Sequence, residues 1–537
     1  MKPCFWALTA AFTLAMFCAG ESWAANYYVD ASAAAGGNGS ASRPWNDFND
    51  IAGLKAGDSV RFAGEFKNAP LTVTWPGKKG APVVFRQWSG HPAWKINGGG
   101  LTNENGVSIK ASHVRVESAE VFNSPLCGVT AIGGGLTDVE FSKIVSHDNK
   151  DSGFYIASWD PNGPIADIRL DNCVAHDNGA HGFAHAGEVN GVTHEGGEAY
   201  GNGRLVAGHG YTSTPMRFPV KKEEWKSQTG TVYKAVVPSS SVNRVVDADA
   251  HIDLTRKDGD PSTLGVNQWT IQGKTLYVNK GGWKELKSTR IYYIFSHCRN
   301  IRYINCSAHH NISFPGGSVE GHGFSFDSYD EDGLIYGCRA YENDGHGFTT
   351  FASTNVDIVY SLAYGNGGRG INLFPMNRSS KIINNTSHGN KLSGIVVYRP
   401  SDGARIINNI ASNNGNHGLE ITGANGAVTA MAHHHNGFHG NGGRAVCDYQ
   451  GGGQCGGSPG AGSLEADPLL VNPGSGDFRL NAASPFIDKG VDRGYDTDLL
   501  GNPSPAGKSV DLGAVEFQAG PPSASTLPAP KGLRFLP

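Results

Sequence analysis

Apolar and polar residues alternate in short runs that recur at a regular interval between residues 335 and 421. Each run starts directly after a Gly, which itself stands four residues after an Asn. Four such pairs occur: Asn343 with Gly347, Asn366 with Gly370, Asn390 with Gly394, and Asn414 with Gly418. The Asn residues are 23 or 24 positions apart. A period of this length is typical of solenoids, in which each repeat buries its apolar face against its neighbours.

Alternation with period two predicts strands, and nothing between the runs has helical periodicity. Several short strands per repeat, with repeats stacked about 4.8 Å apart, define a parallel β-helix. Its hand is expected to be right-handed from the general crossover rule. The predicted fold class is therefore all-β, a right-handed parallel β-helix with an N-terminal cap helix and a β-rich insertion.

The N-terminal part of the chain predicts export and a capped solenoid end. Residues 1–24 contain Lys2, an apolar core and small residues at the end. This is the pattern of a cleaved signal peptide, so we expect the protein to be secreted, either periplasmic or extracellular. Residues 25–100 are expected to form the cap and the first coils. A short amphipathic helix, from about Trp45 to Leu54, would cover the open strand edges at the end of the solenoid.

The rest of the chain divides where the Asn-to-Gly repeat stops and restarts. Coils are expected over residues 101–214 and 291–446, separated by a β-rich insertion at 215–290. Residues 447–518 are expected to form a Gly-rich loop and a closing segment. The tail, residues 519–537, is rich in Pro, Ser and Ala, a composition typical of disorder.

Charge and cysteine content narrow the partners and the compartment. The net charge of -4 over 537 residues gives no reason to expect nucleic acid. Beyond the signal peptide we expect no membrane span, and we expect a monomer. Seven of the nine cysteines lie outside the signal peptide, and Cys447 with Cys455 is the expected disulfide. Cys173, Cys306 and Cys338 share one position in their repeats, which predicts a buried stack.

Aligning the repeats on Gly predicts which side chains can meet a ligand. The first and third residues after Gly are mostly apolar and are expected to point inward. The second and fourth are expected to face solvent in one stripe along the outer sheet. The stripe includes Thr212, Ser325, Asp327, Thr349, Phe351, Asn372, Phe374, Val396, Tyr398 and Glu420.

The residue before Gly is a His in most repeats. The set consists of His181, His209, His322, His346, Arg369 and His417. Such a basic strip could meet a carboxylated sugar chain, and neighbouring imidazoles would titrate as a coupled set near neutral pH. The alternative is structural, because His also suits a turn before Gly and can hydrogen-bond the backbone there. Arg369 departs from the pattern and favours a functional role.

One cluster of carboxylates lies near the stripe, in the run FDSYDEDG. Asp327, Asp330 and Asp332 are candidate ligands for calcium, which takes several oxygen ligands. The alternative is a solvated turn. A glycosidase would need two carboxylates about 5 to 10 Å apart, and Asp327 and Glu420 lie too many coils apart for that.

Most of residues 26–518 resembles the pectate-lyase-like β-helix superfamily, and within it the family-nine pectate lyases. The resemblance rests on coils of the form AYxN followed by xGF, on the N-terminal run YYVDASAAAGGNGSASRPW, and on the closing run DPLLVNPGSGDFRLNAASPFIDKG. It implies a secreted polysaccharide lyase that uses calcium and a Lys base. The family's calcium-binding run falls on NKDSGFY, where Asp151 alone remains, and the Lys position falls on Thr212 or Ser325.

The remaining residues support elimination on an acidic, uronate-containing polysaccharide. The reaction needs a cation at the sugar carboxylate and a base for the neighbouring proton. Arg369 and Arg399 are candidate cations, His322 or His346 the candidate base, and Tyr398 a candidate proton donor. The candidate substrate contacts are His209, Asp327, Asn372, Phe374 and Phe351. A uronate epimerase, a glycoside hydrolase and a non-catalytic carbohydrate-binding β-helix remain alternatives.

Overall fold

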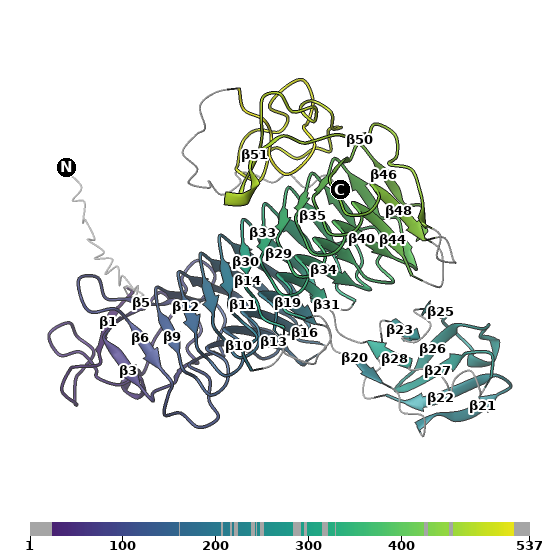
Figure 1. Ribbon diagram of the computed structural model, residues 1–537. Coiled ribbons are helices and arrows are strands. Elements are labelled where there is room, and N and C mark those ends of the chain that lie inside the picture. The colour runs from purple at the N-terminus through teal and green to yellow at the C-terminus, as the bar shows by residue number, and fades with distance from the viewer. Residues whose placement is uncertain are drawn as a thin grey trace, which may run out of the picture.

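The structure is a computed structural model, and Figure 1 shows its long solenoid with a lobe at one side. It describes residues 24–519, with the exception of 161, 206–207, 215–216, 220–223, 238–241, 243, 248–251, 283–290, 295–297, 314–319, 328, 424–427 and 450–454. The expected signal peptide and almost all of the expected disordered tail lie outside these residues. No helix in the described ranges has the length and apolar character needed to cross a membrane.

Three sheets of 13 strands each form the solenoid, and each coil contributes one strand to every sheet. The first sheet consists of β1 (Asn26–Asp30), β2 (Ser59–Ala63), β5 (Val83–Gln87), β8 (Val114–Glu117), β11 (Thr137–Ser142), β14 (Ile165–Asp171), β17 (Val189–Glu195), β29 (Cys298–Ile304), β32 (Leu334–Tyr336), β35 (Asp357–Val359), β38 (Lys381–Ile383), β42 (Arg405–Ile407) and β46 (Ala432–His434). The second consists of β4 (Leu71–Val73), β7 (Val107–Ile109), β10 (Val129–Ile132), β13 (Phe154–Ser158), β16 (Phe183–Gly187), β19 (Tyr211–Thr214), β31 (Phe324–Asp327), β34 (Phe348–Phe351), β37 (Ile371–Leu373), β40 (Ile395–Tyr398), β44 (Leu419–Thr422), β48 (Val446–Tyr449) and β49 (Cys455–Gly456). The third consists of β3 (Glu65–Lys67), β6 (Lys95–Asn97), β9 (Glu120–Phe122), β12 (Val145–His147), β15 (Val174–His176), β18 (Glu198–Tyr200), β30 (Ser307–His309), β33 (Arg339–Tyr341), β36 (Leu362–Tyr364), β39 (Thr386–His388), β43 (Ile410–Ser412), β47 (Gly437–His439) and β50 (Leu464–Glu465).

Successive strands pair in parallel and in register, as in β31 with β34, where Phe324 faces Phe348; the exception is β49, which pairs antiparallel with β48. This confirms the predicted parallel β-helix. The inward positions are also confirmed, since the first and third residues after each Gly are buried. Stacked rings fill part of this core, with 4.7 to 5.3 Å between the ring centroids of successive members of the series Phe154, Phe183, Tyr211, Phe324 and Phe348. Each stacked pair adds about 0.5–1.5 kcal/mol beyond the burial of its area.

The Asn residues that stand four positions before each Gly form a hydrogen-bonded ladder inside the turn between the third and second sheets. Each side-chain amide donates to the next Asn Oδ1, for example Asn343 to Asn366 (2.9 Å) and Asn366 to Asn390 (2.8 Å). The ladder also includes Asn202 and Asn311 and continues to Asn441. A second ladder of the same kind joins Asn385, Asn409 and Asn436.

The prediction of a cap helix is wrong. Between Trp45 and Leu54 the chain forms only one 3-10 turn, η1 (Phe48–Asp50), with the Asp47 side chain as its N-cap. Trp45 instead bridges to Val29 of β1, and the backbone at Ile51 is extended. The apolar side chains recur every third residue, so an irregular chain can bury them. The segment still covers the solenoid end, because Phe48 packs on Phe66 with ring centroids 4.3 Å apart.

The chain leaves the solenoid after β19 and returns at β29, and the segment between them forms two sheets. One consists of β20 (Arg217–Pro219), β28 (Ile291–Ile294), β23 (Arg244–Asp247) and β24 (Ile252–Asp253). The other consists of β21 (Lys226–Thr229), β22 (Val232–Val236), β27 (Thr275–Asn279), β26 (Gln268–Gln272) and β25 (Thr255–Arg256), and η3 spans Pro261–Thr263. Trp225, Trp269 and Leu276 form part of a separate apolar core. This lobe lies beside the solenoid in Figure 1.

The closing segment, residues 464–518, folds back over the first and third sheets (Figure 1). Besides β50 it contains β51 (Leu470–Asn472), η4 (Pro473–Ser475) and β52 (Asp477–Leu480). Outside this segment, β41 (Ser401–Asp402) and β45 (Val428–Thr429) form a further sheet of two strands. Phe478 and Val515 pack on Leu362 of β36. The Tyr360 hydroxyl donates to the Glu516 carboxylate (3.1 Å).

The cysteines behave as expected. Cys447 and Cys455 form a disulfide, and Cys173, Cys306 and Cys338 are buried in the solenoid core.

Candidate active site

A groove of about 480 Å³ runs along the outer face of the second sheet, from β19 to β40. Its walls and floor come from five successive coils, which at the β-helix spacing cover about 19 Å. The lining residues are His209, Glu320, His322, Ser325, Asp327, His346, Thr349, Phe351, Arg369, Phe374, Leu392 and Tyr398. The solenoid therefore brings together eight of the ten residues that the sequence singles out for catalysis and substrate contact.

One wall of the groove is a stack of imidazole rings before the Gly turns. The ring centroids of His209 and His322 are 4.8 Å apart, and those of His322 and His346 are 4.7 Å apart, with nearly parallel planes. In each coil the Nδ1 atom accepts a hydrogen bond from the backbone N–H of the next coil. His346 donates to His322 in this way (2.8 Å), and Arg369 donates to His346 (2.9 Å).

These hydrogen bonds define the tautomer of the rings. A neutral imidazole whose Nδ1 accepts carries its proton on Nε2. Burial lowers the pKa of His209 and of His322 well below the ordinary value, and lowers that of His346 to about 3. The stack is therefore a row of neutral Nε2–H donors. The structural role that the sequence suggests for a His before Gly, a hydrogen bond with the backbone, is taken by the Nδ1 atoms.

Arg369 ends this wall and is paired with a tyrosine. Its Nη2 donates to the Tyr398 hydroxyl (2.9 Å), and its guanidinium carbon lies 5.3 Å from the centre of the Tyr398 ring. The Tyr398 ring stacks on Phe374 at 5.2 Å, and the Nε of Arg369 has no hydrogen-bond partner among the described residues. The groove thus holds a guanidinium and a hydroxyl in fixed contact beside two aromatic rings.

Two of the expected site residues do not reach the groove. Arg399 forms an ion pair with Asp448 and donates to the Tyr449 carbonyl oxygen (3.2 Å), so its charge is neutralised within the solenoid. Asn372 is fully buried beneath the groove, where its amide donates to Thr349 Oγ1 (3.3 Å).

The outer stripe is less exposed than the alternation predicts. Thr212, Ser325, Thr349, Asn372 and Val396 face outward but are 0–4% exposed. In an in-register sheet each small outward side chain has copies on both sides about 4.8 Å away, and longer neighbours cover it. These positions form the floor of the groove, while the fourth positions after Gly, such as Phe351 and Tyr398, form its rim.

The three carboxylates expected to hold calcium point in different directions. Asp327 lines the groove, and Asp332 lines a separate cleft on the first sheet, where Asn355 donates to it (2.7 Å). Asp330 is fully buried in the solenoid, where the Ser213 hydroxyl donates to it (2.7 Å) and burial raises its pKa well above the usual range. These residues do not fit a shared calcium site.

A different trio, His209, Glu320 and His322, places one potential ligand atom each within 4.8 Å of the others. The Nδ1 atoms of both rings accept backbone N–H groups, so each ring carries its proton on Nε2. The Nε2 atom of His209 lies 3.3 Å from Glu320 as a donor. A metal would have to displace these protons, so the donor set favours hydrogen bonding over metal binding.

Sequence reasoning misses Glu320 and Leu392 in the groove lining. Both stand in the turn before Gly, outside the alternating runs, so no periodicity marks them. Glu320 carries one usable signal, since it stands two residues before His322 in the run VEGHG.

The comparison with protein families agrees with the fold. Residues 294–456 match the family model described as a right handed beta helix region, which confirms the predicted hand. No curated protein sequence matches the chain. Among solved structures, pectate lyase Pel9A is similar at 16% identity, with a TM-score of 0.47, over 93% of this chain and 98% of the other. The A-module of mannuronan C-5 epimerase AlgE6 from Azotobacter vinelandii is similar at 14% identity, with a TM-score of 0.45, over 77% and 91%.

A third solved structure, the complex of XylC with xylose, is similar at 9% identity, with a TM-score of 0.49, over 91% of this chain and 98% of the other. At such low identities these structures do not define the reaction or the substrate of this chain.

Proposed function

We propose that the protein is a secreted polysaccharide lyase that cleaves a uronate-containing chain by β-elimination in the groove of the second sheet. The observation that carries this proposal is the Arg369–Tyr398 pair at the end of the imidazole wall. A guanidinium suits a sugar carboxylate because it offers a planar fork of donors. It also stabilises the negative charge that develops on the carboxylate when the neighbouring C–H proton leaves.

Tyr398 is the proton-transfer group in this proposal. Its hydroxyl accepts the C5 proton of the uronate while it passes its own proton to the leaving oxygen at C4. The C4–O bond breaks, a C4=C5 double bond forms, and the tyrosine ends in the state in which it began. Transfer through a positioned hydroxyl requires only hydrogen-bond reach of both atoms.

The imidazole wall has a binding role in this proposal. The sequence makes His322 and His346 candidate bases. A base needs a free lone pair, however, and the Nδ1 lone pairs of both rings accept backbone N–H groups. Their Nε2–H groups instead donate to sugar hydroxyls, while Phe351 and Phe374 contact the apolar faces of the sugar rings. Asp327 accepts hydrogen bonds from sugar hydroxyls at the far end of the groove.

The test is an assay of the ultraviolet absorbance of unsaturated uronates on a panel of acidic polysaccharides. We expect a rise with one of them, reduced at least about 100-fold in Arg369→Ala and in Tyr398→Phe. Arg399→Ala is the matched control, since Arg399 is occupied by Asp448. Changed uronate stereochemistry without cleavage would replace the proposal by an epimerase, and new reducing ends without absorbance would replace it by a hydrolase. Binding without either product would leave a carbohydrate-binding protein.

A further inference from the structure

A second cleft lies far from the groove, where the closing segment meets the third sheet. It has a volume of about 680 Å³, within the range of small-molecule sites. Its solenoid wall comes from Arg339 of β33 and Leu362 of β36, and its other wall from β52 and the loops around Leu499 and Val515. Figure 1 shows the closing segment beside β33.

Arg339 is a half-buried cation that no residue in the described ranges pairs with. Its guanidinium makes no hydrogen bond or ion pair with any residue that the structure describes. Burial lowers its pKa from the ordinary value, which reflects the loss of water around the charge. The guanidinium nitrogens keep some contact with water, but a partly desolvated charge still needs an anionic partner.

The carboxylates that line the same cleft cannot meet this need, because each is engaged elsewhere. Asp477 binds Arg479 through both oxygens (2.9 and 2.6 Å). Glu516 accepts from the hydroxyls of Tyr360 and Ser504 (both 3.1 Å) on the side facing the first sheet. The cleft therefore presents one uncompensated guanidinium.

Apolar and polar side chains both line the cleft around Arg339. The apolar ones are only 2–4% exposed and are Leu362, Phe478, Leu480 and Val515. The polar side chains that line the cleft and are exposed include Ser475, Asn481 and Gln518. A uronate fits this combination, because its hydroxyls hydrogen-bond polar side chains while its carboxylate pairs with a guanidinium.

We propose that this cleft is a second, non-catalytic site that binds a uronate sugar, with Arg339 pairing its carboxylate. The choice of a uronate rests on the proposed function, whereas the need for a carboxylate rests on Arg339 itself. Such a site would hold a polysaccharide chain or its product on a different face from the groove, and this adds avidity.

The test is a calorimetric titration of the Arg369→Ala protein with galacturonate, so that the groove cannot take up the carboxylate. We expect saturable binding that weakens at least about tenfold when Arg339→Met is added, because a charged hydrogen-bonded pair is lost. Arg339→Lys, which keeps the charge and the aliphatic stem, should retain part of the affinity and serves if the Met variant fails to fold. Arg405→Met, in the separate cleft of the first sheet, is the matched control.

Three outcomes would overturn this inference: no binding by Arg369→Ala, equal binding with and without Arg339, or equal binding of neutral galactose. If acetate binds as tightly as galacturonate, the site recognises a carboxylate alone, and the proposal of a sugar site is wrong. A failure of this inference can be distinguished from a failure of the proposed lyase function, because turnover by the wild-type protein is measured independently of binding at Arg339.

Discussion

Two stacks of imidazole rings run along this solenoid, and their nitrogen atoms contact different partners. In the groove, His209, His322 and His346 accept backbone N–H groups at Nδ1 and are buried. On the outer face of the third sheet, His147 and His176 stack at 4.7 Å with parallel planes, just as closely. The stacking geometry is the same, so it cannot account for any difference in chemistry.

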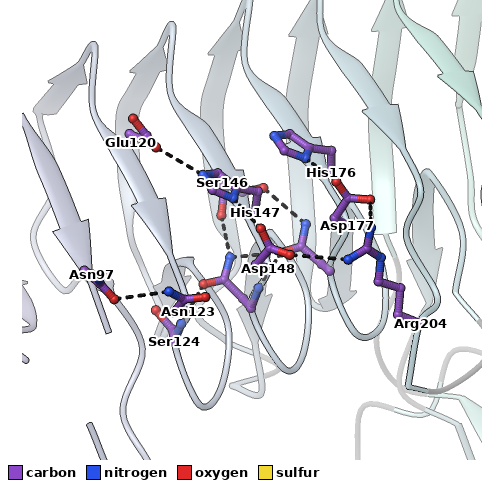
Figure 2. Close-up of polar contacts among 12 residues, drawn as sticks. Asn97, Glu120, Asn123, Ser124, Ser146, His147, Asp148, His176, Asp177 and Arg204 are labelled. Atoms are coloured by element: carbon purple, nitrogen blue, oxygen red, sulfur yellow. Dashed lines mark hydrogen bonds and ion pairs between the residues drawn. The ribbon is translucent and has the colours of Figure 1, made fainter. Parts of the chain in front are cut away.

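The outer stack is bounded by carboxylates instead of backbone amides. Figure 2 shows His147 between Asp148 (2.8 Å) and Glu120 (3.3 Å), with Asp177 next to His176 and Arg204 bridging Asp148 and Asp177. Further along the same stack, the hydrogen bond from His309 (3.1 Å) lowers the pKa of Glu198. The hydrogen-bond partner, and not the ring stack, decides whether an imidazole serves as a neutral donor or as part of an ion-pair network.

The largest expected difference between the stacks is in stability. His322→Ala removes the acceptor of the buried His346 N–H and leaves a cavity, so we expect a loss of about 2–4 kcal/mol in the free energy of unfolding. His176→Ala breaks partly exposed contacts and should cost about 1 kcal/mol. Urea denaturation of both variants measures the difference, and equal losses would contradict the distinction drawn between the stacks.

The second difference concerns turnover. His346→Ala removes an Nε2–H donor to the substrate, and we expect kcat/KM to fall about tenfold. His346→Gln keeps both an acceptor for the Arg369 N–H and a donor toward the groove, so it should stay within about threefold of the wild type. The matched variant His147→Ala should leave kcat/KM unchanged. An inactive Gln variant would show that His346 is a base after all.

The third difference is in the response to acid. The pKa of His322 in the folded protein lies well below its ordinary value of 6.5. Its contribution to stability is therefore complete above pH 6.5 and declines as the pH falls below it. The pKa of Glu198 is lowered from 4.5, so the contribution of this carboxylate declines only as the pH falls below 4.5. Denaturation between pH 7 and 4 should thus show a first decline that is shallower in His322→Gln, where the buried His209 and His346 still contribute, and unchanged in Glu198→Gln.

A control for this experiment lies in the closing segment. Burial, with a smaller effect of Asp511, raises the pKa of Glu516 from 4.5 to about 7. Its contribution is present at acid pH and is lost as the pH rises from 4.5 through 7, which opposes the slope from His322. Glu516→Gln should remove this opposing slope and make the acid decline steeper. An unchanged profile would show that Glu516 does not titrate in this window.

The smallest expected effect belongs to the ion pairs of the outer stack. Arg204 is about half exposed, with 49% of its side chain accessible. Arg204→Ala should cost less than about 1 kcal/mol, and salt should reduce this cost further because exposed charges are screened. In contrast, the cost of His322→Ala should not depend on salt. A cost for Arg204→Ala that persists in high salt would show that this network is more buried than its exposure indicates.

The sequence alone determined the fold and most of the groove. The spacing of Asn and Gly and the period-two alternation are local features, and a parallel in-register solenoid converts them directly into columns of side chains. For this reason His209, His322, His346, Arg369 and Tyr398 could be placed on one surface before any contact was known. The cap helix failed because a repeat of three apolar positions in so short a segment does not distinguish a helix from an irregular chain.

Only the tertiary structure decided what each of these side chains contacts. Whether a ring nitrogen meets a backbone amide or a carboxylate depends on how one coil is placed on the next, as does the pairing of Arg399 with Asp448 in place of the groove. The directions of Asp327, Asp330 and Asp332 depend on how the backbone bends between β31 and β32, and the order of residues in the sequence does not reveal this. The isolation of Arg339 arises from a closing segment more than 100 residues away, and no local pattern encodes such a contact.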